Sequence, residues 1–295
     1  MIRLAIRVAR ADAELVLAEL LELVPAGVEE VDRGDEVEYA VYGAPGELPA
    51  LPALSARAGG RPIAVSTTEV ADDWAQRWRE HHRPLVLDGL VVRPPWASAP
   101  SDSSGVEVVI DPGQAFGTGA HATTRLCLEL LLDVAGERRG SVAPPPAVAA
   151  DAVLDIGCGS GVLAIAAARL GLGSVRAVDH DPASVEATRQ NAAVNDVDIH
   201  VSRLDLRTDP LPEAPLVLAN LVRGLLLVLA RRLRDPPPGI VLARRLRDPP
   251  PGILLASGLL TGEADEAAAA FAGAGLVERD RREREGWVAL RLQRA

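Results

Sequence analysis

Residues 153–161, which read VLDIGCGSG, constrain the fold of this chain more than any other segment. A short apolar run predicts a strand that ends near Asp155. Three glycines follow at every second position: Gly157, Gly159 and Gly161. Glycine lets a backbone come close to a ligand, and the N-terminus of the helix predicted next, from VLAIAAARLG, favours a bound carboxylate or phosphate. Asp179 stands 20 residues after Gly159, at the end of the next predicted strand, where an acid can accept hydrogen bonds from both ribose hydroxyls.

A dinucleotide-binding fingerprint is the main competing interpretation of this loop. It requires the pattern G-x-G-x-x-G, which would place its third glycine at position 162, and that residue is Val162. The pattern here is G-x-G-x-G after a leading acid, which is similar to motif I of class I methyltransferases. A nicotinamide oxidoreductase is therefore disfavoured, although it stays open as an alternative.

Alternating strands and helices predict one larger α/β domain over residues 101–295. Strands are expected at 106–110, 153–156, 174–179, 198–201, 215–219, 253–257, 276–282 and 287–292. Helices are predicted between most of them. This order favours a mostly parallel, Rossmann-like sheet with helices on both faces. The similarity of the glycine loop to that of class I methyltransferases implies that the sheet has seven strands.

A smaller α+β domain is predicted over residues 1–67. Strands are expected at 2–8, 27–31, 36–42 and 62–67, with helices at 12–24 and 46–58. The resulting order of strand, helix, strand, strand, helix, strand is that of a ferredoxin-like domain. Residues 68–100 are predicted to form a linker helix and a proline-rich turn between the two domains.

Composition excludes several classes of protein. The formal charge is −10, from 41 acidic and 31 basic residues, which disfavours a nucleic-acid-binding protein. No apolar run is long enough for a membrane span, and no signal peptide is recognised, so a soluble cytoplasmic protein is expected. The two cysteines, Cys127 and Cys158, lack the spacing of a zinc site, so no metal is expected. We also expect a monomer.

Residues 111–124, which read DPGQAFGTGAHATT, make the interpretation narrower. Here the chain resembles the bacterial ribosomal protein L11 methyltransferase family, which carries a closely similar segment ahead of motif I. The resemblance continues through residues 155–171, 179–195 and 216–221, and it includes DWAQRWREHHRPL at 73–85 and REGWVALRL at 284–292. The departures are small: Ala122 replaces a usual proline, and Asp196 stands where glycine is common.

The resemblance implies a class I methyltransferase that uses S-adenosylmethionine. It places cofactor contacts on Thr124, Gly157, Asp179 and Asn220, and we expect further contacts from Phe116, Thr118, Asp155 and Gly159. Asn220 and the backbone carbonyl of Leu221 would hold the amine that receives the methyl group. The substrate implied is ribosomal protein L11, methylated on lysine or N-terminal amino groups. Thr124 is also expected to cap its helix, whereas His121 is expected to form a hydrogen bond within its loop.

A tandem duplication is the largest departure from the family pattern. Residues 228–240 and 241–253 both read VLARRLRDPPPGI. One copy is expected to complete a helix after Leu221 and lead into the strand at 253–257, and the other copy to form extra surface structure. The duplication therefore leaves open a catalytically impaired member of the family. A methyltransferase of another protein lysine also remains an alternative, beside the nicotinamide oxidoreductase.

Overall fold

The computed structural model describes residues 2–13, 16, 29–43, 64–69, 83–101, 105–111, 121–140, 153–212, 214–234 and 252–294. The chain divides into two compact units, residues 1–81 and 82–295. Among the helices that the structure describes, none is both long and apolar enough to cross a membrane.

The first unit is built on a four-stranded antiparallel sheet. Its strands are β1 (Ile2–Ala9), β2 (Glu29–Asp32), β3 (Glu36–Gly43) and β4 (Ala64–Glu69), in the order β2-β3-β1-β4. This order, with β1 between β3 and β4, is that of a ferredoxin-like sheet, as predicted. The 3-10 turn η1 (Arg10–Asp12) follows β1. The helices predicted at 12–24 and 46–58 lie outside the described residues, apart from Asp12, Ala13 and Val16.

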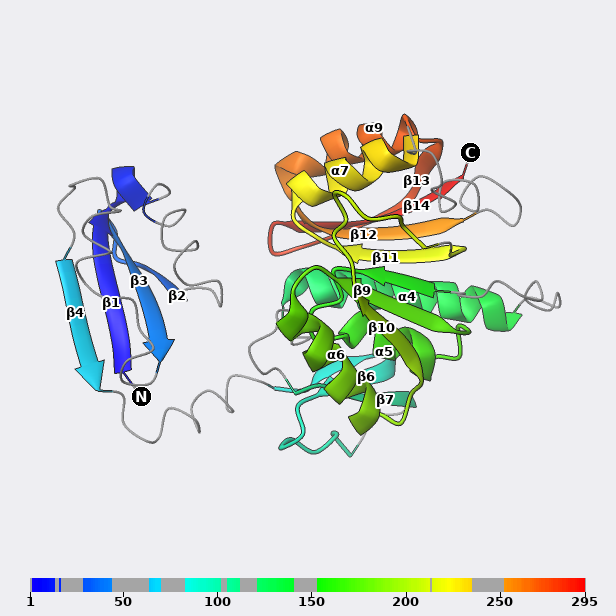
Figure 1. The fold of residues 1–295 in the computed structure, drawn as a ribbon, viewed down its shortest axis with the longest axis horizontal. Helices are drawn as coiled ribbons and strands as arrows, with labels where there is room; N and C mark the ends of the chain where they lie inside the picture. The colour runs from blue at the N-terminus through cyan, green and yellow to red at the C-terminus, as the bar shows by residue number, and fades with distance from the viewer. Residues whose placement is uncertain are drawn as a thin grey trace. The chain divides into compact units, whose positions relative to one another are not determined.

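The second unit contains the predicted seven-stranded sheet (Figure 1). Its strands are β8 (Val153–Ile156), β9 (Val175–Asp179), β10 (Ile199–Arg203), β11 (Leu216–Asn220), β12 (Ile253–Leu260), β13 (Leu276–Arg284) and β14 (Trp287–Arg294). The order is β10-β9-β8-β11-β12-β14-β13. The first five strands run parallel, and β14 pairs antiparallel with β12 and β13.

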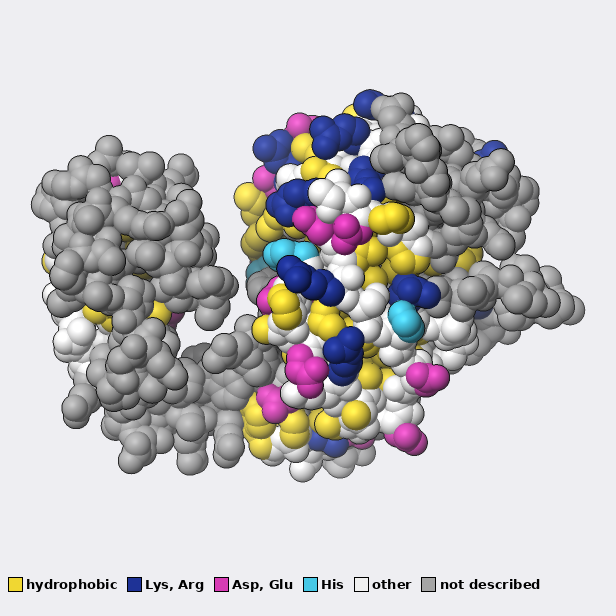
Figure 2. Space-filling view, in the orientation of Figure 1, with side chains coloured by type: hydrophobic (Ala, Val, Ile, Leu, Met, Phe, Trp, Pro, Cys, Tyr) yellow, Lys and Arg dark blue, Asp and Glu magenta, His cyan; other side chains and the backbone are white. Residues whose placement is uncertain are grey.

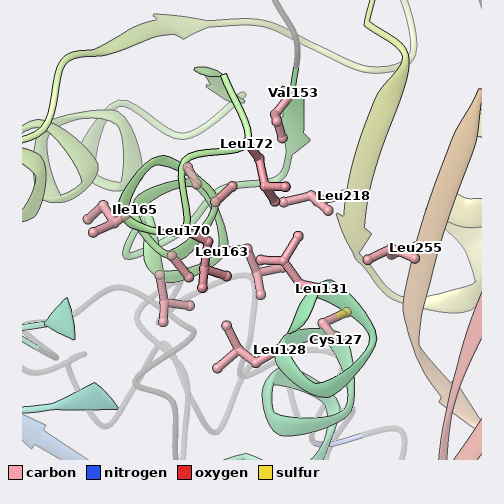
Figure 3. Close-up of a cluster of buried hydrophobic side chains, with 14 of the residues drawn as sticks. Cys127, Leu128, Leu131, Val153, Leu163, Ile165, Leu170, Leu172, Leu218 and Leu255 are labelled. Atoms are coloured by element: carbon pink, nitrogen blue, oxygen red, sulfur yellow. The ribbon is translucent and has the colours of Figure 1, made fainter. Parts of the chain in front are cut away.

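Helices cover both faces of this sheet (Figure 1). One face carries α4 (Ala122–Gly140), α5 (Val162–Arg169) and α6 (Pro182–Val194), and the other carries α7 (Arg223–Arg234) and α9 (Ala264–Ala272), which follows the short turn η2 (Thr261–Glu263). Successive residues of a strand point to opposite faces of the sheet, so Val153 lies in the first core and Leu154 in the second. Figure 3 shows the first core, where Leu128 and Leu131 of α4 lie near Leu163 of α5.

A second, three-stranded sheet packs on the first core. It consists of β5 (Leu85–Leu87), β6 (Gly89–Arg93) and β7 (Gly105–Val109), with β6 antiparallel to β5 and parallel to β7. Its buried residues Leu90 and Val108 belong to the same core as α4 and α5. The strands β5 and β6 lie within residues 68–100 and were not predicted. The linker helix predicted within that segment falls at residues that the structure does not describe.

The duplicated segment spans α7 and the start of β12. The first copy supplies residues 228–234, the end of α7, and the second copy supplies Ile253, the first residue of β12. Residues 235–251 lie outside the described part of the chain.

On the face shown in Figure 2, basic side chains over α7 lie among acidic ones, and Arg223 forms ion pairs with Glu263 and Glu266.

Candidate active site

The loop between β8 and α5 forms the floor of the site. Its glycines adopt positive φ angles: 74° at Gly157, 53° at Gly159 and 84° at Gly161. A Cβ atom on Gly157 would lie 2.3 Å from Cδ2 of Leu221, and one on Gly161 would lie 2.8 Å from Cγ2 of Thr188. Both positions therefore need glycine for the backbone angle and for the close approach of a neighbour.

Asp179 ends β9 beside this loop. Its Oδ2 atom accepts a hydrogen bond from the Gly159 N–H at 3.0 Å, and Oδ1 accepts one from the Asp181 N–H at 3.0 Å. Each carboxylate oxygen can accept more than one hydrogen bond, so these contacts fix the carboxylate and leave it able to bind vicinal hydroxyls. Asp179 also lines the pocket described below, and its predicted contact with a ribose stays a prediction.

Asp155 lies behind the glycine loop rather than among the residues that line the pocket. The residue is 1% exposed, and Oδ2 accepts a hydrogen bond from the Ala164 N–H of α5 at 3.1 Å. Its Oδ1 atom is buried and has no hydrogen-bond partner among the described residues. Burial, together with the nearby charge of Asp179, raises the pKa of the Asp155 carboxyl from 3.8 to about 7.

Asn220 and Leu221 lie where β11 ends. Nδ2 of Asn220 donates a hydrogen bond to Oγ1 of Thr124 in α4, and the Leu221 N–H donates one to the Ser257 carbonyl at 2.9 Å. The next residue of β12, Gly258, has a φ of +92° and sits at an irregularity of the strand pairing. A Cβ atom there would lie 2.2 Å from the Leu221 carbonyl oxygen, so the backbone of Leu221 packs directly on Gly258.

A pocket of about 260 Å³ opens at the carboxyl ends of β8, β9, β10 and β11. Strand order reverses between β8 and β11, and ligands of open α/β sheets bind at such a switch point. Six predicted site residues line it: Thr124, Gly157, Gly159, Asp179, Asn220 and Leu221. The predicted contacts Phe116 and Thr118 lie outside the described residues.

Several lining residues were missed by the sequence analysis. They follow β9 and β10 directly: His180, Ser184, Leu204, Asp205, Leu206 and Arg207. The rule that ligands bind beyond the carboxyl ends of parallel strands would have identified them, because β10 was predicted within a few residues of its observed end.

His121, not Thr124, caps the helix α4. The first helical hydrogen bond runs from the Arg125 N–H to the His121 carbonyl, and His121 Nδ1 accepts the Thr123 N–H at 3.3 Å. Burial lowers the pKa of His121 and so favours the neutral ring, in which Nδ1 can accept a hydrogen bond. The expected capping by Thr124 is therefore wrong, since Thr124 lies inside the first turn, where its hydroxyl accepts from Asn220 instead. His121 also packs edge-on against Trp287.

Known proteins are similar to this chain in both sequence and fold. A family model described as ribosomal protein L11 methyltransferase (PrmA) matches residues 52–295. A ribosomal protein L11 methyltransferase of Pelobacter propionicus is 38% identical over 80% of this chain and 70% of its own length. One from Burkholderia lata is 34% identical over 97% of this chain and 96% of its own. For three further relatives, the match covers 53% to 65% of the relative.

Among solved structures, the chain is similar to a ribosomal protein L11 methylase of Lactobacillus delbrueckii subsp. bulgaricus. The TM-score is 0.57 and the identity is 29%, over 70% of this chain and 96% of that one. The similarity therefore reaches across nearly the whole of that structure.

Proposed function

The chain belongs to the ribosomal protein L11 methyltransferase family, and on that premise we propose that it transfers methyl groups from S-adenosylmethionine to lysine or N-terminal amino groups of ribosomal protein L11. The observation that carries the proposal is a single pocket lined both by the glycine loop with Asp179 and by Asn220 with Leu221. The glycine loop with Asp179 suits a methyl donor that contains a nucleoside, and Asn220 with Leu221 suits an amine that accepts the methyl group.

The pocket residues fit S-adenosylmethionine. Asp179 would accept the ribose hydroxyls, and the glycine loop at the N-terminus of α5 would hold the amino-acid end of the cofactor. The fit is supported by the pocket of about 260 Å³, which is lined by both Gly157 and Asp179. When bound, S-adenosylmethionine supplies an electrophilic methyl group on a sulfonium.

The protein must then present a neutral amine in line with that methyl group. Oδ1 of Asn220 and the carbonyl of Leu221 are acceptors at the end of β11 that can orient the amine N–H bonds. Partial burial of the amine near the pocket lowers its pKa and favours the form that attacks. Alignment of donor and acceptor supplies the main part of such catalysis, so no dedicated base is invoked.

The first unit would recognise the protein substrate. A ferredoxin-like sheet in a compact unit of its own would bind ribosomal protein L11 while the second unit carries out the transfer. Of the predicted joining segment 68–100, residues 85–93 form β5 and β6 of the second unit, so only the residues before them would let the substrate be presented in more than one way.

The test is incorporation of labelled methyl groups from S-adenosylmethionine into purified ribosomal protein L11, with an Asn220→Ala variant as the control. We expect label on L11 with the natural chain and a large loss of label with the variant. Labelled bands of other proteins in a lysate, with L11 unlabelled, would instead identify a methyltransferase of another protein.

An impaired enzyme is tested by deleting residues 241–253, which joins Ile240 to Leu254 and leaves one copy of the duplicated segment. The natural chain keeps Asn220 opposite Ser257, so β11 and β12 are in register on both sides of the duplication. We therefore expect activity of the deletion variant within about threefold of the natural chain, since a factor of three corresponds to less than 1 kcal/mol. A much larger gain on deletion would show that the duplication impairs this member of the family.

A further inference from the structure

The helix α6 carries a stripe of buried polar side chains. Thr188 and Asn191 in the helix, and Asn195 just after its last residue, follow one another at helical spacing and are 0%, 2% and 6% exposed. Asp181 starts the helix by accepting hydrogen bonds from the N–H groups of Ala183 and Ser184. The buried face of a helix usually carries apolar residues, so polar side chains there are expected to make specific hydrogen bonds.

Asn191 joins two separate segments of the chain. Its Oδ1 atom accepts a hydrogen bond from the Asp111 N–H at 2.9 Å. Its Nδ2 atom donates to the Asp111 carbonyl at 3.2 Å and to the Ser160 carbonyl at 2.9 Å. Asp111 follows β7, and Ser160 is a buried residue of the glycine loop. One side chain therefore ties the end of the small sheet to the loop that forms the floor of the pocket.

Thr188 and Asn195, the neighbours of Asn191 on the stripe, each bind one of these two segments. Thr188 donates a hydrogen bond to the Gly159 carbonyl at 2.9 Å and so supports the glycine loop. Asn195 accepts from the Val109 N–H at 2.7 Å and donates to the carbonyls of Val109 and Asn191. In the hydrogen bonds of the described residues, Asn195 therefore holds the small sheet and α6, whereas Asn191 reaches both the small sheet and the loop.

We propose that Asn191 is a positioning residue for the S-adenosylmethionine site, an inference that rests on the proposed function. Asp111 begins the segment 111–124, which ends at the pocket residue Thr124 and contains the predicted cofactor contacts Phe116 and Thr118. The Asn191 amide fixes the start of that segment against the glycine loop. It acts through these backbone segments and does not line the pocket itself.

The stripe supplies its own matched control. Asn191→Asp and Asn195→Asp each replace a buried amide donor with an oxygen that faces two backbone carbonyls. We expect both variants to lower the thermal midpoint of the full chain to a similar extent. Binding of S-adenosylhomocysteine, measured by titration calorimetry, should weaken by about tenfold or more in Asn191→Asp and by less than about threefold in Asn195→Asp.

Asn191→Ala, which introduces no charge, serves if Asn191→Asp does not fold, and the same difference from Asn195→Ala is expected. Equal losses of affinity at positions 191 and 195, or natural affinity in the Asn191 variants, would overturn the positioning role. Failure of the natural chain to bind S-adenosylhomocysteine would contradict the proposed function as well, so the two failures are distinguishable.

Discussion

Asn220 donates a hydrogen bond from Nδ2 to Oγ1 of Thr124 at 3.3 Å. The two residues stand 96 positions apart in the chain, and both line the pocket. Because the Thr124 hydroxyl accepts a hydrogen bond from the amide nitrogen of Asn220, Oδ1 is the atom of Asn220 that can accept a hydrogen bond from an amine. The contact therefore sets the orientation on which the proposed role of Asn220 depends.

Asn220→Ala should lower kcat/KM for methylation of ribosomal protein L11 by about thirtyfold to a hundredfold, since loss of an oriented, half-buried acceptor costs ~2–3 kcal/mol. Affinity for S-adenosylhomocysteine should fall by a smaller factor, about threefold to tenfold, because Asn220 is also an expected cofactor contact. The measurements are steady-state kinetics with labelled cofactor and calorimetric titration.

Thr124→Val is the partner of that experiment, because it removes the hydroxyl and keeps the shape of the side chain. A smaller loss of kcat/KM, about threefold to tenfold, is expected from an Asn220 that is less well oriented. If Asn220→Ala weakened cofactor binding by the same factor as it lowered the rate, Asn220 would be a cofactor residue only.

Gly157→Ala tests the close approach of the glycine loop to Leu221, and Gly171→Ala is its control. Both glycines have a φ of +74°, but nothing lies within 4 Å of a Cβ atom on Gly171. The control should lose only ~1 kcal/mol of unfolding free energy, from the backbone angle. Gly157→Ala should also weaken S-adenosylhomocysteine binding by about tenfold or more, because its methyl group would displace Leu221.

The double variant Gly157→Ala with Leu221→Ala separates the two effects. It removes the side chain that the new methyl group would meet, so part of the lost affinity should return. No recovery, together with equal affinities of the two single glycine variants, would show that the approach to Leu221 is unimportant for the site.

Gly258→Ala tests the carbonyl of Leu221. A Cβ atom at position 258 would meet backbone rather than a flexible side chain, and the Leu221 N–H is already held by Ser257. The carbonyl must therefore move, and kcat should fall by about tenfold or more, with a smaller change in cofactor affinity. Gly275→Ala, at a φ of +83° with open space around it, should leave kcat unchanged. A natural kcat in Gly258→Ala would contradict the role of this carbonyl.

The sequence was sufficient where local pattern decides structure. The strand predicted at 153–156 is observed at those residues, because a short apolar run that leads into a glycine loop favours a strand. The strands β5 and β6 were missed although Asp88 and Gly89 between two apolar runs are a hairpin signal. The prolines that follow this hairpin signal, Pro94, Pro95 and Pro100, predicted a turn in the same segment instead.

Contacts between distant residues could not be read in the same way. The bonds from Asn191 to Asp111 and Ser160 span 80 and 31 positions, and no local pattern specifies them. Only the helical spacing of Thr188, Asn191 and Asn195 hinted that polar side chains face inward there.

Asp155 should make the stability of the ligand-free chain depend on pH. Its pKa is about 7 in the folded chain and 3.8 as its ordinary value, so the folded state binds the proton more tightly. The contribution to stability is full below the ordinary value and is lost as pH rises through about 7. The pKa is raised because burial disfavours the ionised carboxylate. A missing partner for the protonated carboxyl is not the cause.

Asp155→Asn removes this titration while it keeps an oxygen that can accept the Ala164 N–H. The unfolding free energy of the natural chain, relative to the variant, should therefore fall by up to ~4 kcal/mol between about pH 4 and pH 8. Urea unfolding of both proteins at several pH values measures that difference. A difference that stays constant, or that grows with pH, would show that Asp155 is ionised in the folded chain and has found partners for its second oxygen.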